Sequence, residues 1–135
     1  MTCSDTSILI VEDEPAISGL LVALLGGRFC CQTAESAETA IGLLDAHRFH
    51  LVLADIGLPG TSGLDLCRLI AARDPKPPVV LISGKIDLEA EIEARQAGAF
   101  DFLPKPFDLA DVLTTVHCAL AEPAQASALV SANSD

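Results

Sequence analysis

Short runs of branched apolar residues, separated by stretches with helical spacing, constrain the fold of this chain more than any other feature of its sequence. Three runs are too short for a core helix, and each closes on a polar or turn residue: SILIV (7–11), LVLA (51–54) and PVVLIS (78–83). Such runs are typical of strands buried on both faces of a parallel sheet. Two weaker runs, FCCQTA (29–34) and AFDFLP (99–104), complete a prediction of five strands.

Helical patterns follow each of these strands. The expected helices are Ala16–Leu25, Ala37–Ala46, Leu64–Ala72, Leu88–Ala97 and Leu109–Leu120. Pro15 suits a first helical turn, Ser36 can cap the second helix, and Gly98 can end the fourth. Strands and helices therefore alternate, which predicts an α/β fold with helices on both faces of a parallel sheet. In such sheets, ligands bind beyond the carboxyl ends of the strands.

The bulk properties fit one small soluble domain. The longest apolar stretch, ISGLLVALL (17–25), is much shorter than the ~20 residues that a membrane span needs. The N-terminal MTCSDTS lacks the basic and apolar regions of a secretory signal, and the five cysteines form no CxxC pair, so we expect a cytoplasmic protein. A formal net charge of −11 repels nucleic-acid phosphates, which predicts no direct DNA binding.

The end of the chain differs in composition from the rest. Residues 122–135, EPAQASALVSANSD, are small and polar apart from one Leu-Val pair. We expect a domain over 1–121 followed by a short flexible tail. The initiating Met1 and this soft tail favour a complete small protein, although a fragment of a longer one is the alternative.

Three acidic side chains are predicted to meet at one edge of the sheet. The first strand ends in Val11-Glu12-Asp13, and the third reaches Asp55, so neighbouring strands would bring their carboxylates together. An ionised Asp at the end of a buried strand is costly unless it is paired or bound to a cation. Dense carboxylate oxygens suit Mg²⁺, to which Gly57 would add its backbone carbonyl.

Two phosphate-binding groups are predicted at the same edge. The fourth strand closes on Ser83, which offers a hydroxyl, and the fifth closes on Lys105, which offers an ammonium. A carboxylate can attack phosphorus and form an aspartyl phosphate, while a metal and a lysine stabilise the charge on the transferring group. These residues therefore predict that Asp55 is a metal-assisted phosphoryl acceptor.

Four motifs occur in the order of a known family. LIVEDEP, VLADIGLPGTSG, VVLISG and AGAFDFLPKPF resemble the successive motifs of the response-regulator receiver domain of two-component signalling, from about Ser7 to about Leu120. The resemblance implies a flavodoxin-like doubly wound sheet with strand order 2-1-3-4-5 and five helices. It also implies that a histidine kinase or a histidine phosphotransfer protein phosphorylates Asp55, and that Glu12, Asp13, Asp55 and the Gly57 carbonyl hold Mg²⁺.

The resemblance assigns further roles near the phosphoryl group. Ser83 and Lys105 would contact the phosphate, and the Lys105-Pro106 bond would be cis. Phe102 would turn when Ser83 moves inward, although core packing is the default for an aromatic residue on a strand. The fourth helix, fifth strand and fifth helix would then carry the change to a separate protein effector, with no membrane involved.

Several functions stay open at this point. The leading one is a stand-alone receiver that takes part in its own phosphorylation without being a turnover enzyme. The alternatives are a phosphorelay intermediate that passes the phosphoryl to another histidine protein, a receiver that has lost phosphorylation, and a receiver excised from a longer regulator. A phosphatase is disfavoured, because Asp55 is followed by Ile56-Gly57 and the DxDx[TV] signature is absent.

Overall fold

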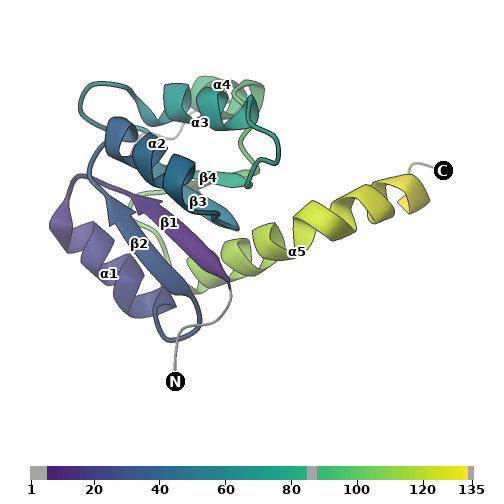
Figure 1. The fold of residues 1–135 in the computed structure, drawn as a ribbon, viewed down its shortest axis with the longest axis horizontal. Helices are drawn as coiled ribbons and strands as arrows, with labels where there is room; N and C mark the ends of the chain where they lie inside the picture. Colours follow the sequence, from purple (N-terminus) through teal and green to yellow (C-terminus); the bar gives the residue numbers. More distant parts are fainter. Residues whose placement is uncertain (1–5, 85–87, 134–135) are drawn as a thin grey trace.

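A single parallel sheet forms the centre of the molecule (Figure 1). The computed structural model describes residues 6–84 and 88–133, with side chains up to Ala121. The strands are β1 (Ser7–Val11), β2 (Cys30–Ala34), β3 (Leu51–Asp55), β4 (Val79–Ser83) and β5 (Asp101–Pro104). Their order in the five-stranded sheet is β2-β1-β3-β4-β5 with parallel pairing throughout, so the predicted fold class and strand order are confirmed.

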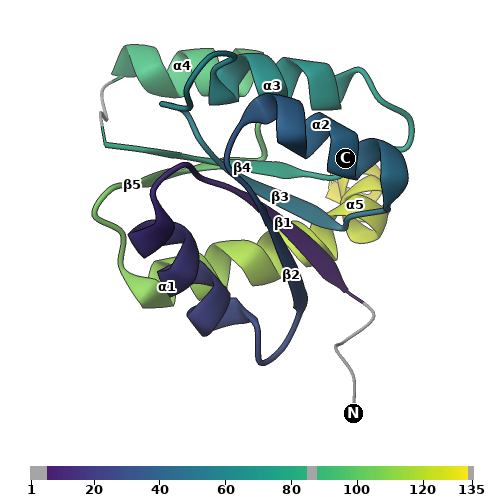
Figure 2. The same cartoon turned by 60° about the vertical axis from the view of Figure 1, so that its left-hand side comes forward.

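Helices cover both faces of this sheet. They are α1 (Pro15–Leu25), α2 (Ala37–Ala46), α3 (Gly63–Ala71), α4 (Leu88–Gln96) and α5 (Leu109–Asn133). Figure 2 shows α1 and α5 on one face and α2, α3 and α4 on the other. In the described part of the chain, no helix combines the length and the apolar character that a membrane span would need.

Local sequence signals set most helix boundaries. Pro15 occupies the first turn of α1, and Ser36 caps α2 by accepting a hydrogen bond from the Thr39 N–H at 3.2 Å. Gly98 follows α4 with a φ of +97°, a left-handed conformation that glycine adopts at low cost. The largest boundary difference is α5, which runs to Asn133 rather than Leu120 through an alanine-rich segment of high helix propensity. That residues 122–135 form a flexible tail stays a prediction.

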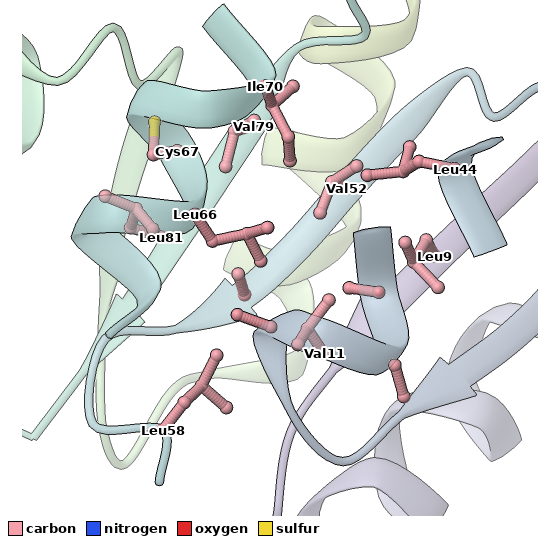
Figure 3. Close-up of a cluster of buried hydrophobic side chains, with 14 of the residues drawn as sticks. Leu9, Val11, Leu44, Val52, Leu58, Leu66, Cys67, Ile70, Val79 and Leu81 are labelled. Atoms are coloured by element: carbon pink, nitrogen blue, oxygen red, sulfur yellow. The ribbon is translucent and has the colours of Figure 1, made fainter. Parts of the chain in front are cut away.

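Alternating side chains of the central strands build two cores. Leu9 and Val11 pack under α2 and α3, while Ile8 and Ile10 point to the opposite face and pack under α1 and α5. Figure 3 shows the first of these clusters, in which Leu66 and its neighbours from α3 cover the middle of the sheet. Each fully buried side chain of this kind contributes about 1.5–3 kcal/mol, so the central strands are held rigidly. The groups at their ends are therefore held in place.

Gly63, the first residue of α3, determines how closely that helix approaches the end of β3. Its N–H donates a hydrogen bond to the Ile56 carbonyl at 2.9 Å. A Cβ atom at this position would collide with the backbone carbonyl of Asp55. The absence of a side chain at Gly63 therefore lets α3 begin directly against the backbone of Asp55.

This contact predicts opposite effects for two glycine substitutions. Gly63→Ala should lower the free energy of unfolding by about 1–3 kcal/mol, because the added methyl group overpacks a rigid backbone. Gly42→Ala in α2 is the matched control: its Cβ would meet no atom within 4 Å, and alanine should stabilise the helix by up to about 1 kcal/mol. Urea unfolding measures both. A Gly63→Ala variant as stable as the parent protein would contradict the packing argument.

Candidate phosphoacceptor site

The sheet brings the predicted site residues to its carboxyl edge. Glu12 and Asp13 directly follow β1, Asp55 is the last residue of β3, Ser83 is the last of β4, and Lys105 follows β5. Backbone hydrogen bonds extend the sheet to these positions: the Lys105 N–H donates to the Ser83 carbonyl at 2.8 Å. The sequence-based expectation that these side chains share one edge is confirmed in geometry, whereas their chemical roles stay predictions.

Three carboxylates converge at this edge. Glu12 is 3% exposed and Asp55 is 7% exposed, while Asp13 is on the surface. One oxygen from each of the three lies within 4.8 Å of the others. Carboxylates this close repel one another when ionised, so the cluster needs a positive charge nearby.

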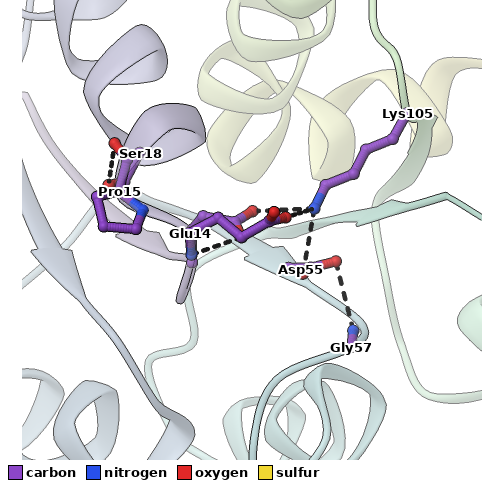
Figure 4. Close-up of polar contacts among 7 residues, drawn as sticks. Glu14, Pro15, Ser18, Asp55, Gly57 and Lys105 are labelled. Atoms are coloured by element: carbon purple, nitrogen blue, oxygen red, sulfur yellow. Dashed lines mark hydrogen bonds and ion pairs between the residues drawn. The ribbon is translucent and has the colours of Figure 1, made fainter.

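Lys105 supplies that charge (Figure 4). Its side chain is 17% exposed, and its Nζ lies 3.2 Å from Asp55 Oδ2 and 3.3 Å from Glu12 Oε1. Glu14, a fourth carboxylate at this edge, is the third to contact this ammonium, with Oε1 at 3.4 Å from Nζ. One cation therefore lies among three anions, and the ammonium leaves part of their charge unbalanced.

Burial and charge shift the pKa values of both buried partners. Burial raises the pKa of Glu12 above its ordinary value, and the nearby Asp55 charge adds to this, while the Glu14 N–H and the Lys105 charge oppose it. For Lys105, burial lowers the pKa, but the hydrogen bond and charge of Asp55 and the charge of Glu12 outweigh it. The net pKa of Lys105 is raised, so its side chain is a cation at neutral pH.

The cluster fits a small divalent cation. Glu12 Oε1 is buried, and within the described residues it has no hydrogen-bond partner, its contact with Lys105 being an ion pair only. Because Lys105 shares its charge among three carboxylates, this buried oxygen is only partly compensated, and a hard cation such as Mg²⁺ prefers such carboxylate ligands. Glu12, Asp13 and Asp55 would hold the ion.

The remaining predicted residues surround this cluster. Gly57 lies in the loop after β3, and its N–H donates to Asp55 Oδ1 at 3.3 Å, which orients the carboxylate. Ser83 is buried at the end of β4, and Phe102 on β5 packs partly buried against the core under α2, α3 and α4. The Lys105-Pro106 bond is cis, as expected from the resemblance.

Sequence reasoning missed two contributors to the site. It assigned no role to Glu14, although three consecutive acids after β1 were a signal for a larger carboxylate cluster. It also missed the hydrogen bond at 2.7 Å from Thr61 Oγ1 to Glu38 Oε2, which ties the loop after β3 to α2. This bond lowers the pKa of Glu38. It also restrains the loop that contains Gly57.

Comparison with known proteins identifies the family. The family model described as response regulator receiver domain matches residues 8–117. The chain belongs to the response regulator receiver domain family. This receiver is 43% identical over 113 residues to the response regulator protein PilR of Pseudomonas aeruginosa, covering 83% of this chain and 25% of PilR. It is 38% identical over 112 residues to the DNA-binding transcriptional regulator NtrC of Klebsiella pneumoniae, covering 82% of this chain and 24% of NtrC.

Solved structures agree with this assignment. A putative response regulator from Chloroflexus aurantiacus superposes with a TM-score of 0.83 at 27% identity, covering 87% of this receiver and 99% of that chain. The BeF3-activated DrrB receiver domain gives a TM-score of 0.80 at 29% identity, and the match covers 86% of this receiver and 97% of that chain. By contrast, this receiver spans only about a quarter of the length of PilR and NtrC.

These relatives correct one prediction. The sequence predicted a separate protein effector, reached through α4, β5 and α5, and no direct DNA binding. That prediction is wrong, because the relatives that share this receiver include proteins named DNA-binding transcriptional regulator. The prediction of no direct DNA binding rested on the net charge of this chain alone. About three quarters of each such relative lies outside the match, and the charge of this chain says nothing of what those parts bind.

The raised pKa of Glu12 predicts a pH dependence of stability in EDTA. A carboxyl whose pKa exceeds its ordinary 4.5 in the folded protein favours folding below pH 4.5, and this contribution is lost as pH rises through the folded-state pKa. Glu12→Gln should therefore be more stable than the parent at neutral pH, since each unit of pKa difference corresponds to about 1.4 kcal/mol. Urea unfolding across the acidic to neutral range measures the effect.

Glu38→Gln is the matched control, because the pKa of Glu38 is shifted in the opposite direction from that of Glu12. The pKa of Glu38 is lowered, so its contribution is present above its ordinary 4.5 and is lost as pH falls through the folded-state pKa. This variant should be slightly less stable than the parent at neutral pH, because Glu38 is exposed. If the free energy of unfolding of Glu12→Gln changed with pH in the same way as that of the parent protein, the raised pKa of Glu12 would be contradicted.

Proposed function

We propose that this receiver accepts a phosphoryl group on Asp55 from a histidine kinase or a histidine phosphotransfer protein, with Mg²⁺. The observation that supports this best is the Lys105 ammonium at 3.2 Å from Asp55 Oδ2, at an edge where Glu12 and Asp13 also meet. This set offers a nucleophile, a cation for phosphoryl oxygens and ligands for a metal within one small volume.

The transfer is an in-line exchange at phosphorus. A carboxylate oxygen of Asp55 forms the new bond, while the bond between phosphorus and the donor breaks and its electron pair leaves with the donor. Asp55 is held for this attack by the Gly57 N–H on Oδ1 and by Lys105 on Oδ2. Lys105 then turns from the carboxylates to the phosphoryl oxygens. The bound Mg²⁺ supplies charge stabilisation for the transferring group.

The same proposal includes a conformational response. Ser83 is buried at the end of β4, the strand that pairs with β3, and its hydroxyl would move toward a phosphoryl group on Asp55, because charged phosphate oxygens accept strong hydrogen bonds. Phe102 is only partly buried on β5, so it would turn into the space that Ser83 leaves. The surface around β5 would change shape as a result.

We propose that the receiver undergoes one phosphorylation event per acceptor site and does not turn over a separate substrate, and that it acts in the cytoplasm. The same chemistry serves a receiver that works alone, one that relays its phosphoryl to another histidine protein and one that belongs to a longer regulator. Continued hydrolysis of p-nitrophenyl phosphate, beyond one equivalent per chain, would contradict the proposal that the receiver does not turn over a separate substrate.

Intact mass tests the acceptor directly. Incubation with acetyl phosphate and Mg²⁺ should add one phosphoryl group, about 80 Da, as expected for an acyl phosphate intermediate. EDTA and Asp55→Asn should each abolish the adduct, whereas Asp111→Asn, an exposed carboxylate on α5, should retain it. An adduct that persists in Asp55→Asn would exclude Asp55 as the acceptor.

Glu14 is predicted to slow phosphoryl uptake. It competes for the Lys105 ammonium at 3.4 Å and adds negative charge where an anionic donor must approach. Glu14→Gln should speed phosphorylation by acetyl phosphate about 1.4- to fivefold, the range that corresponds to an exposed ion pair worth about 0.2–1 kcal/mol. Rapid-quench mass analysis measures the rate, with Glu93→Gln on α4 as a distant control. An unchanged or slower rate in Glu14→Gln would show that Glu14 does not oppose transfer.

A further inference from the structure

A cavity lies at the opposite edge of the sheet from Asp55. Its volume is about 730 Å³. Its walls are the end of α2 with the loop that follows it (44–50) and the loop between α3 and β4 (73–78), closed by Thr6 before β1 and Leu120 on α5. This volume lies within the range of about 300–1,000 Å³ typical of small-molecule sites, and it is far larger than one inorganic ion requires.

The inner surface of this cavity is apolar. Leu44 and Phe49 belong to the buried core, and Leu120 is partly buried against the second core. Three prolines of the loop between α3 and β4 complete the apolar lining: Pro75, Pro77 and Pro78. An aromatic ring with proline and leucine side chains favours a flat apolar group.

The rim of the cavity is basic, in contrast to the rest of the chain. Of the eight Lys and Arg residues and three His residues in the sequence, five line this cavity: His47, Arg48, His50, Arg73 and Lys76. Only two acids face them, Asp45 and Asp74. With the histidines neutral, three cations face two carboxylates, which leaves one positive charge in excess. Because the whole chain carries −11, an anion is favoured at this cavity more than over the chain as a whole.

The charged groups on the rim differ in their availability. Arg73 is already paired with Asp45, with 2.7 Å between Nη2 and Oδ1. In the described part of the chain, Arg48 and Lys76 make no ion pair. The Nδ1 atom of His50 accepts a hydrogen bond from the Ser7 N–H at 3.0 Å, so the neutral ring carries its proton on Nε2. Among the described residues, two cations without an ion pair, one imidazole donor and one unpaired carboxylate, Asp74, therefore remain.

We propose that this cavity binds an organic phosphate of about nucleotide size, with a planar apolar body. The phosphate dianion matches the two free cations, Arg48 and Lys76, and Arg48 can bind it through two parallel hydrogen bonds. The planar body packs on Phe49 and the proline-rich wall. This site is separate from the carboxylate cluster, because its residues flank the amino ends of β1, β3 and β4.

Calorimetric titration in EDTA tests the proposal, with adenosine monophosphate and 1-naphthyl phosphate as probes. EDTA prevents metal-assisted phosphate binding at the carboxylate cluster. At least one probe should bind saturably with one site per chain, and adenosine, 1-naphthol and inorganic phosphate should each bind at least about tenfold more weakly. Saturable binding of neither probe would overturn the proposal, and inorganic phosphate binding as tightly as the esters would reduce the site to simple anion binding.

Matched variants assign the binding to this cavity. The double variant Arg48→Gln, Lys76→Gln should weaken the probe at least about tenfold, while Arg95→Gln on α4 and Asp55→Asn should leave it unchanged. Circular dichroism checks that each variant is folded, which is expected because Arg48 and Lys76 are exposed. Probe binding that survives the double variant would place the site elsewhere. Binding of a hexaglutamate peptide in preference to both probes would assign the cavity to a protein partner instead.

Discussion

The ion pair between Lys105 and Asp55 is the interaction on which the carboxyl edge of this sheet depends. The parallel strands place Glu12, Asp13 and Asp55 together, and the two buried carboxylates would repel each other without a nearby cation. Lys105 reaches them from the far side of β4, with 3.2 Å between Nζ and Asp55 Oδ2. The rigid apolar strands are what make this crowding possible, because they fix the backbone from which each charged side chain extends.

Much of this arrangement was predictable from the sequence, because it is encoded locally. Runs such as VVLIS end on a polar residue, and parallel pairing then places every strand end at the same edge. Helix starts at Pro15 and Ser36 were equally local signals. The contact between Glu14 and Lys105 was not predictable in this way, since it joins residues 91 positions apart through two long side chains. The length of α5 was missed because composition was given more weight than helix propensity.

The two edges of the sheet have contrasting electrostatics. The carboxyl edge gathers Glu12, Asp13, Glu14 and Asp55 around one lysine, whereas the opposite edge holds an apolar cavity with a basic rim. The cavity at the opposite edge could not be predicted from the sequence, because most of its residues come from two loops that carry no recognisable motif. Net charge also misled the prediction of partners. A value of −11 averages over both edges and describes neither, and it has no bearing on what other parts of the related regulators bind.

The central claim is that the charge balance at the carboxyl edge makes Asp55, rather than a neighbouring acid, the phosphoryl acceptor. The most direct measurement is borohydride reduction of the phosphorylated protein, followed by peptide mass analysis. Reduction converts an aspartyl phosphate to homoserine, and the account predicts homoserine at position 55 alone. Label at Asp13 or a reduced side chain at Glu12 would contradict the account, as would a borohydride-resistant phosphate on Ser83.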